Sequence, residues 1–361
     1  PHLRFPEFHG EWEKCKLGDI AEFSTARVSS VKLDCKNYVS TENMLQDFQG
    51  VVEAKSVPNE TNVISFTCGD ILISNIRPYL KKVWKATFDG GCSSDVFVLQ
   101  ATDTVAKDYL HYAVANDKFI NYVMSGAKGV KMPRGDKNQM RTYQLSLPSI
   151  QEQYKIAKLL TLLDERIATQ SKLIEKLESL IKGLRVSLMQ IENGNIVHLG
   201  EIARIYQPQT ISSTELTEDG FLVYGANGII GKYKEYNHKT EQICITCRGN
   251  TCGMVNYTKP MSWITGNAMV INTDEHQNKV CKRYLYHYLS AYNFNSIISG
   301  SGQPQIVRTP LEKLEITLPS IFEQEQKAML LDRIQAKIEI SNRVLSLYQE
   351  QKQYLLRQMF I

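Results

Sequence analysis

The sequence lacks the features of a membrane protein and of a secreted, disulfide-stabilised protein. No apolar run approaches the ~18 residues of a membrane-spanning helix, and no secretory signal pattern opens the chain. The eight cysteines are scattered without the spacing of a disulfide framework, which indicates reduced thiols. We therefore expect a cytoplasmic protein that makes no contact with a membrane.

The motifs of nucleotide-dependent catalysis are also missing. The segment Gly225–Tyr233 superficially resembles a phosphate-binding loop, but Ala226 and Tyr233 stand where that motif needs Gly and Ser or Thr. Glycine-rich turns in a β-hairpin are the better interpretation. The Asn/Asp-Pro-Pro-aromatic tetrapeptide of amino-methyltransferases is absent, and the seven histidines form no Ser/His/Asp pattern. The sequence thus predicts no catalytic centre and no cofactor in this chain.

Four cysteines of the second half leave one metal-binding alternative open. Cys244, Cys247, Cys252 and Cys281 could be read as zinc ligands. The second pair lacks the Cys-x-x-Cys spacing, however, and Cys244 lies in an apolar, strand-like run. Buried strand thiols are favoured over a zinc site, so no metal is expected.

What the chain does contain is a frame that occurs twice. The entry Leu17–Glu22 recurs as Leu199–Arg204, and the exit Leu147–Gln153 recurs as Leu318–Gln324. The exits are 171 residues apart (318 − 147), whereas the sequences between entry and exit differ. A duplicated frame with two different inserts predicts two related recognition units held at a fixed separation.

A long helix is expected after each exit. Ser149 with Glu152, and Ser320 with Glu323, have the spacing of a helix capping box. Apolar residues then follow a heptad pattern, which predicts two helices that pair with each other. Each has roughly 40 residues and a length of about 60 Å. In the first helix the pattern comprises Ile156, Leu160, Leu163, Ile167, Ile174, Leu177, Ile181, Leu184 and Leu188; in the second it comprises Leu331, Ile334, Ile338, Leu345, Tyr348, Leu355 and Met359.

The second heptad pattern is the weaker one. Lys327 and Lys352 stand where the first helix has Ile156 and Ile181. The alternative, in which one helix belongs to a bundle and the other is an oligomerisation tail, is disfavoured because the two patterns match position by position.

The inserts have the alternating strand and helix signals of mixed α/β domains. The expected strands are 70–74, 96–99, 243–246 and 268–271, and the expected helices are 108–124 and 282–299. The predicted fold class is α+β: two mixed α/β recognition domains joined by two long helices in an antiparallel coiled coil, with a pseudo-twofold internal repeat. The predicted segments are residues 1–148, 149–190, 191–319 and 320–361.

Basic, amide and aromatic side chains gather at the predicted loop ends of both inserts. Such side chains grip phosphates and read base edges, so we predict DNA-binding sites there. In the first insert the candidates are Asn75, Arg77, Tyr79, Lys81, Lys82, Lys128, Lys131, Arg134 and Lys137. In the second they are Arg248, Asn250, Lys259, Gln303, Gln305 and Arg308. Solvated surface charge is the alternative for each of them.

Two candidate pairs occupy equal positions in the repeat. Arg248 follows Arg77, and Arg308 follows Lys137, by the same 171 residues that separate the exits (248 − 77; 308 − 137). The net charge of +4 is only mildly basic, which fits a nucleic-acid partner if the excess is concentrated on one face.

Over its whole length the chain resembles the specificity subunits of type I restriction-modification systems. The resemblance rests on the repeated entry and exit motifs, on Leu3–Pro6 with Gly10–Trp12, on Lys182–Leu184 and on Leu355–Phe360. Phe322–Gln326 departs from the family pattern, because the basic residue usual after Glu-Gln is absent.

This resemblance implies a non-catalytic subunit whose two recognition domains each read one half of a split, asymmetric double-stranded DNA target, while the coiled coil sets the spacer. It implies two methyltransferase subunits and two restriction-translocase subunits as partners. S-adenosylmethionine, ATP and Mg would belong to those partners. The alternative is a stand-alone DNA-binding protein or an antirestriction scaffold with the same coiled coil.

Overall fold

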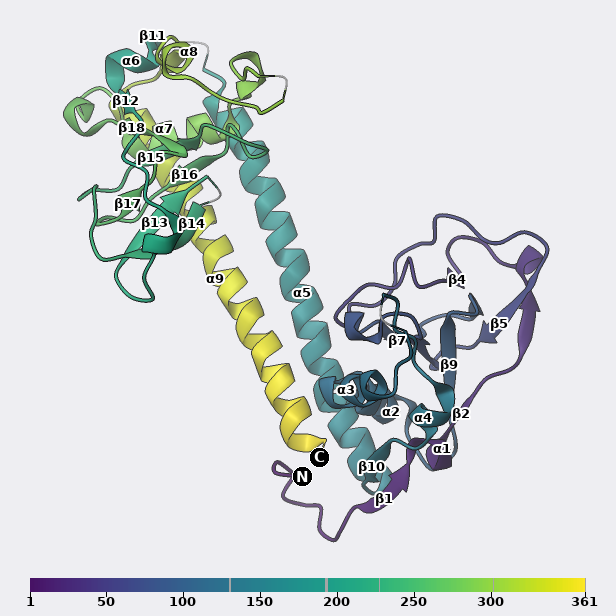
Figure 1. Ribbon diagram of the computed structural model, residues 1–361. Coiled ribbons are helices and arrows are strands. Elements are labelled where there is room, and N and C mark those ends of the chain that lie inside the picture. The colour runs from purple at the N-terminus through teal and green to yellow at the C-terminus, as the bar shows by residue number, and fades with distance from the viewer. Residues whose placement is uncertain (130, 192–193, 227, 301, 361) are drawn as a thin grey trace. The chain divides into compact units, whose positions relative to one another are not determined.

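The computed structural model describes residues 1–129, 131–191, 194–226, 228–300 and 302–360 (Figure 1). It consists of two compact units, of which unit 1 comprises Pro1–Gln170 with Val344–Ile361 and unit 2 comprises Ser171–Arg343. The long helices α5 (Ile150–Met189) and α9 (Ile321–Met359) each contribute to both units. None of the helices in the described residues is long and apolar enough to cross a membrane.

Unit 1 is built on two four-stranded sheets. The first is antiparallel and has the order β2 (Ala21–Phe23), β9 (Val96–Ala101), β6 (Ile71–Ser74), β7 (Val83–Lys85). The second has the order β3 (Arg27–Ser29), β5 (Asn62–Phe66), β8 (Gly90–Cys92), β4 (Tyr38–Val39). A separate ribbon of β1 (Glu13–Lys16) and β10 (Gln144–Leu147) joins the entry of the insert to its exit.

Four short helices accompany these strands: α1 (Leu17–Ile20), α2 (Lys107–Val114), α3 (Asp117–Ser125) and α4 (Lys137–Arg141). The 3-10 turns are η1 (Ser30–Lys32) and η2 (Pro78–Leu80). The prediction of one helix over 108–124 was wrong, because Asn116 ends α2 and begins α3. Its side chain donates to the Tyr112 carbonyl and accepts from the Phe119 amide, which caps the second helix.

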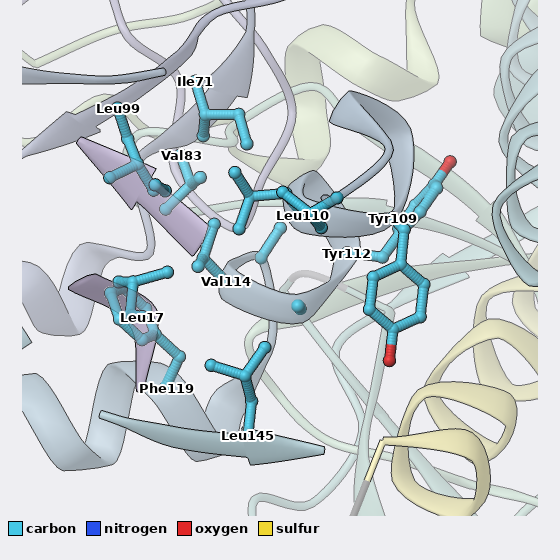
Figure 2. Close-up of a cluster of buried hydrophobic side chains, with 14 of the residues drawn as sticks. Leu17, Ile71, Val83, Leu99, Tyr109, Leu110, Tyr112, Val114, Phe119 and Leu145 are labelled. Carbon is cyan, nitrogen blue, oxygen red and sulfur yellow. The ribbon is translucent and has the colours of Figure 1, made fainter. Parts of the chain in front are cut away.

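The core of unit 1 lies between the first sheet and helices α2 and α3. Figure 2 shows side chains of β6, β7 and β9, such as Ile71, Val83 and Leu99, facing Leu110 and Val114 of α2. The same core continues onto the first turns of α5 and the last turns of α9, which provide Ile156, Leu160, Leu355 and Met359. Burial of these side chains attaches the domain to both long helices.

Unit 2 repeats this plan. Its four-stranded antiparallel sheet has the order β12 (Arg204–Tyr206), β18 (Ala268–Asn272), β15 (Ile243–Thr246), β16 (Val255–Tyr257). A three-stranded sheet contains β14 (Gly228–Tyr233), β13 (Phe221–Gly225) and β17 (Trp263–Ile264), and a ribbon pairs β11 (Asn195–His198) with β19 (Glu315–Leu318). The expected hairpin over 225–233 is confirmed by the antiparallel pairing of β13 with β14, and Asn227 lies outside the described residues.

The helices of unit 2 are α6 (Leu199–Ile202), α7 (Lys282–Ala291) and α8 (Arg308–Glu312), with 3-10 turns η3 (Ser213–Glu215), η4 (Asp274–His276) and η5 (Phe294–Ser296). Helix α7 ends eight residues before the predicted end at 299 (299 − 291). The chain turns there because the Asn293 side chain accepts from the Asn295 amide and begins η5 instead.

The heptad positions of both long helices are buried or half-buried, as predicted. In unit 2, Ile181 packs against Leu331 and Ile338, and Lys327 at the start of α9 donates from Nζ to the Leu188 carbonyl near the end of α5 (2.8 Å). In unit 1, Lys352 pairs with Asp164 (2.6 Å). The helices therefore run antiparallel within each unit, and the two lysines that interrupt the second pattern both have partners.

The predicted capping box forms completely only in α9. There the Glu323 carboxylate accepts from the Ser320 amide (3.1 Å), and Ser320 Oγ accepts from the Glu323 amide (3.3 Å). In α5, Ser149 Oγ accepts from the Glu152 amide, but the buried Glu152 carboxylate binds both Nε and Nη2 of Arg4 at 2.8 Å. The capping prediction for Glu152 was therefore wrong, because a charged partner 148 residues away displaces the local amide.

Candidate nucleic-acid interface

In unit 1 the backbone brings together two of the predicted basic loops. The Arg77 amide donates to the Pro133 carbonyl (2.7 Å), and the Gly135 amide donates to the Asn75 carbonyl (2.8 Å). Lys128 and Arg134 bond to each other through both backbone groups. The loop after β6 and the loop before α4 thus form one surface, which we call the unit 1 loop pair (residues 75–82, 128–129 and 131–137).

Most candidate side chains of the unit 1 loop pair are exposed. Arg77, Tyr79, Lys128, Lys131 and Arg134 all point to solvent. Arg134 makes a long ion pair, 3.6 Å, with Asp95. Solvent-facing cations gathered on one surface are what a phosphate backbone requires.

Other candidates in this loop pair are engaged with the protein. Lys81 Nζ forms an ion pair with Asp117 (2.7 Å), and Lys82 Nζ donates to the Thr41 carbonyl (2.6 Å). Asn75 is half-buried and accepts from the Gly135 amide through its main-chain carbonyl, whereas its buried side-chain Oδ1 has no hydrogen-bond partner among the described residues. The side chains of Lys81 and Lys82 therefore hold the loop against the rest of unit 1.

Burial and neighbouring cations lower the pKa of two lysines in this region. Partial burial and the nearby Arg77 lower the pKa of Lys82. Burial and Arg141 lower the pKa of Lys137, whose ammonium lies over the rings of Phe97 (4.7 Å) and Phe23 (5.4 Å). Like charges placed this close disfavour each other, so the local field favours an anion.

Unit 2 joins the corresponding loops by the same backbone bonds. The Gly249 amide donates to the Pro304 carbonyl (3.0 Å), and the Ile306 amide donates to the Cys247 carbonyl (3.0 Å). We call this surface the unit 2 loop pair (residues 248–250 and 303–308). It presents Arg248, Asn250, Gln303, Gln305 and Arg308, all of them exposed.

A cavity of about 330 Å³ opens at the unit 2 loop pair. Arg248, Gln305 and Arg308 line it from the loops, and Tyr206 and Gln207 line it from the end of β12. The sequence analysis did not name Tyr206 and Gln207. Their position just after the repeated entry Leu199–Arg204 is a signal that could have identified them. Lys259 does not line this cavity and lies on the β16–β17 connection, where its amide bonds Tyr224 Oη (3.0 Å).

The equivalence assigned to Arg77 and Arg248 was wrong by one residue. Strand β6 begins at Ile71 and β15 at Ile243, a separation of 172 rather than 171 (243 − 71). The backbone bonds of the two loop pairs agree with this offset, because Arg77 and Gly249 both donate to the repeat-related prolines Pro133 and Pro304. Arg248 therefore corresponds to Ile76, and Arg77 corresponds to Gly249.

The equivalence of Lys137 and Arg308 is confirmed. Each is the first residue of the short helix, α4 or α8, that follows the second loop. Their contacts differ, since Lys137 lies on two aromatic rings while Arg308 pairs with Glu312 (2.7 Å). Between strand β6 or β15 and the second loop, the two inserts therefore differ by a net one residue, since the separation changes from 172 to 171.

The zinc alternative gains no support from the site geometry. Within the described ranges, no three or more His, Cys, Asp or Glu side chains are grouped as metal ligands. Cys244 is buried in β15, and Cys247 Sγ accepts from Gln207 Nε2 (3.1 Å).

Comparison with known proteins identifies the family. A model described as the type I restriction modification DNA specificity domain matches residues 9–179 and again residues 192–347. The chain belongs to this family. Each unit of the structure thus contains most of one type I specificity domain.

Individual relatives agree with this assignment. The Escherichia coli type I restriction enzyme EcoprrI specificity subunit is 33% identical over 37% of this chain, a match that spans only 34% of that relative. The MjaVIII specificity subunit of Methanocaldococcus jannaschii is 23% identical over 94% of this chain and 91% of that protein. Among solved structures, the type I specificity subunit of M. genitalium has the same fold, with a TM-score of 0.71 at 16% identity over 100% of this chain and 99% of that one.

Proposed function

We propose that this chain is the DNA-binding specificity subunit of a type I restriction-modification complex. The observation that carries the proposal is the occurrence of two specificity domains, each with an exposed basic loop pair at the same end of its main sheet. Each domain reads one half of a bipartite, asymmetric double-stranded DNA target. A stand-alone DNA-binding protein or antirestriction scaffold is not favoured by these relatives.

The long helices are proposed to set the spacer between the half-sites and to bind two methyltransferase subunits. Two restriction-translocase subunits complete the proposed complex. A solved structure titled for complex assembly and conformational transition of the type I R-M system shares the fold, with a TM-score of 0.58 over 99% of this chain and 98% of that one. That likeness supports the fold on which such an assembly is built.

Chemistry is assigned to the partners rather than to this chain. The sequence contains neither the methyltransferase tetrapeptide nor a phosphate-binding loop. We expect the purified chain to transfer no methyl group from S-adenosylmethionine to DNA and to cleave no DNA. Methyl transfer by the chain without partners would contradict this assignment.

Exchange of one insert tests whether each unit recognises its own half of the DNA target. Residues of about 25–140 are replaced by the insert of another family member, and the complex with its methyltransferase subunits is expressed in a host whose methylome is sequenced. We expect one half of the methylated motif to change and the other half to stay the same. The reciprocal exchange between the entry at Leu199 and the exit at Leu318 is the matched control. A change in both halves, or in neither, would show that the units do not read separate half-sites.

A further inference from the structure

Arg77 has a backbone conformation that its side chain disfavours. Its φ is +50° and its ψ is 61°, in the left-handed region that non-glycine residues rarely occupy. At the corresponding position of unit 2 the residue is Gly249, with φ +86°, and the backbone bonds around it are the same. The turn therefore requires a left-handed residue, and unit 2 satisfies this requirement with glycine while unit 1 does not.

A second residue of the same turn shows the same contrast. Lys81 has φ +54°, and its counterpart Gly253 has φ +90°. For Lys81 the structure supplies a reason, because its ammonium forms an ion pair with Asp117 at 2.7 Å and so fastens the turn to α3. The strained backbone of Lys81 is thus accompanied by a stabilising ion pair within the chain.

Arg77 has no comparable ion pair within the described part of the chain. Its side chain is exposed. Its guanidinium makes no hydrogen bond or ion pair with any residue that the structure describes. One charged neighbour is unfavourable, because Arg77 and Lys82 repel each other, and this repulsion adds to burial in lowering the pKa of Lys82. Within the folded chain, Arg77 therefore combines backbone strain with like-charge repulsion.

Backbone bonds of the turn hold Arg77 in this conformation, and residues held in this way cluster at ligand-binding sites. We propose that Arg77 is an anion-binding residue that contacts a backbone phosphate of the DNA held by unit 1. The phosphate would lie between Arg77 and the exposed cations Lys128 and Arg134 across the loop pair. This inference rests on the proposed DNA-binding function and assigns one contact within it.

The test compares Arg77→Asn with Gly249→Ala in the full chain assembled with its methyltransferase subunits. Asparagine tolerates the left-handed region and carries no charge, so folding is preserved while the contact is removed. In Gly249→Ala the added Cβ meets no atom within 4 Å, so only backbone strain is introduced. The probe is a mixed-sequence 40-base-pair duplex, titrated over a range of NaCl concentrations.

For Arg77→Asn we expect roughly three- to tenfold weaker binding and a salt slope smaller by about one, because one phosphate contact is lost. The melting temperature should stay equal or rise. Arg77→Lys should keep the full slope, and Gly249→Ala should lower the melting temperature, because it adds backbone strain to the corresponding turn of unit 2.

Three results would overturn the assignment of Arg77. Wild-type affinity and slope in Arg77→Asn would mean that no DNA contact exists. Weaker binding with an unchanged slope would indicate a base contact instead of a phosphate contact. A melting temperature lowered by several degrees would mean that the guanidinium stabilises the fold.

Failure of the wild-type complex to bind the duplex at all would contradict the proposed function itself. This outcome is distinguishable from the three above, because it is seen without any substitution.

Discussion

Tyr112 and His287 occupy corresponding positions of α2 and α7, and each bonds an aspartate on a long helix. Tyr112 Oη donates to Asp164 Oδ2 (2.8 Å) in unit 1, and His287 Nε2 lies 2.8 Å from Asp332 Oδ1 in unit 2. Because Arg185 Nε donates to His287 Nδ1 (3.2 Å), the neutral imidazole donates from Nε2 to Asp332. The two units thus use different chemistry at one structural position to attach domain to helix.

Removal of either aspartate should loosen one domain and leave the other unaffected. Asp332→Ala leaves the cation Arg283 and the buried His287 without their acceptor. Asp164→Ala removes the partner of Lys352 and leaves Tyr112 Oη with its longer contact to Thr161 Oγ1 (3.3 Å). We expect each to lower the free energy of unfolding by about 1–3 kcal/mol. Hydrogen exchange should accelerate in α7 for the first variant and in α2 for the second.

The matched control for both variants is Glu175→Ala, at an exposed position of α5. It should change the free energy of unfolding by less than about 0.5 kcal/mol. Equal acceleration of α2 and α7 in either aspartate variant would show that these contacts do not act within single units.

His238 should make unit 2 sensitive to mild acid. Burial lowers the pKa of His238 to about 4, and its ring contacts Asn237 Oδ1 through Nδ1 and Tyr206 Oη through Nε2 (2.9 Å). An unfolded histidine titrates near about 6.5, so the unfolded state binds the additional proton between about pH 6.5 and 4. The stability that His238 contributes is complete above pH 6.5 and decreases as the pH falls through this window.

At pH 5 this loss should reach about 2 kcal/mol. The measurement is urea unfolding at pH 7.5 and pH 5.0 for the wild type and for His238→Gln, in which the amide oxygen can still accept from Tyr206. The variant should lose less stability between the two pH values. An identical decrease in both proteins would mean that other groups account for the acid sensitivity.

The length of the helices should determine the spacer in the DNA target. Helix α5 is continuous through Gln170, where one compact unit ends and the other begins. Four residues of helix add about 6 Å, close to two base pairs at about 3.4 Å each. Four-residue insertions after Gln170 in α5 and after Arg343 in α9 nearly complete one helical turn, with a local stutter.

We expect the methylated motif of this variant to gain one or two base pairs of spacer while both half-site sequences stay unchanged. A four-residue insertion after Asn59, in an exposed loop of unit 1, serves as the length-matched control and should leave the spacer as it is. An active complex with the original spacer would show that the helices do not measure this distance.

The frame of the fold could be predicted because its signals are local and repeated. Heptad spacing, the entry and exit motifs and the hairpin over 225–233 follow from short segments read in isolation. The break at Asn116 could not be predicted, because a helix pattern continues on both sides of it. The partner of Glu152 is Arg4, which only the tertiary structure brings within reach.

The grouping of the candidate residues on loops was predicted, but the alignment of the first loops of the two units was wrong by one residue. Basic residues at 77, 128 and 134 do share one surface, and so do those at 248 and 308. The alignment of Arg77 with Arg248 failed because the inserts differ by one residue between the sheet and the second loop, where no repeated motif anchors the count. In the structural alignment, arginine occupies the left-handed position of the turn in unit 1 and glycine occupies it in unit 2.

Gln153 and its counterpart Gln324 have a consequence for how new specificities arise. Gln153 accepts from the Ala106 amide (2.8 Å) and donates to the Pro148 carbonyl (2.9 Å), and Gln324 accepts from the Cys281 amide (2.9 Å) and donates to the Pro319 carbonyl (2.9 Å). All of these partners are backbone atoms. Gln153 and Gln324 therefore bind the backbone of the insert, and these bonds do not depend on which side chains the insert carries. We therefore expect an insert that is exchanged between relatives to keep the backbone bonds to Gln153 and Gln324.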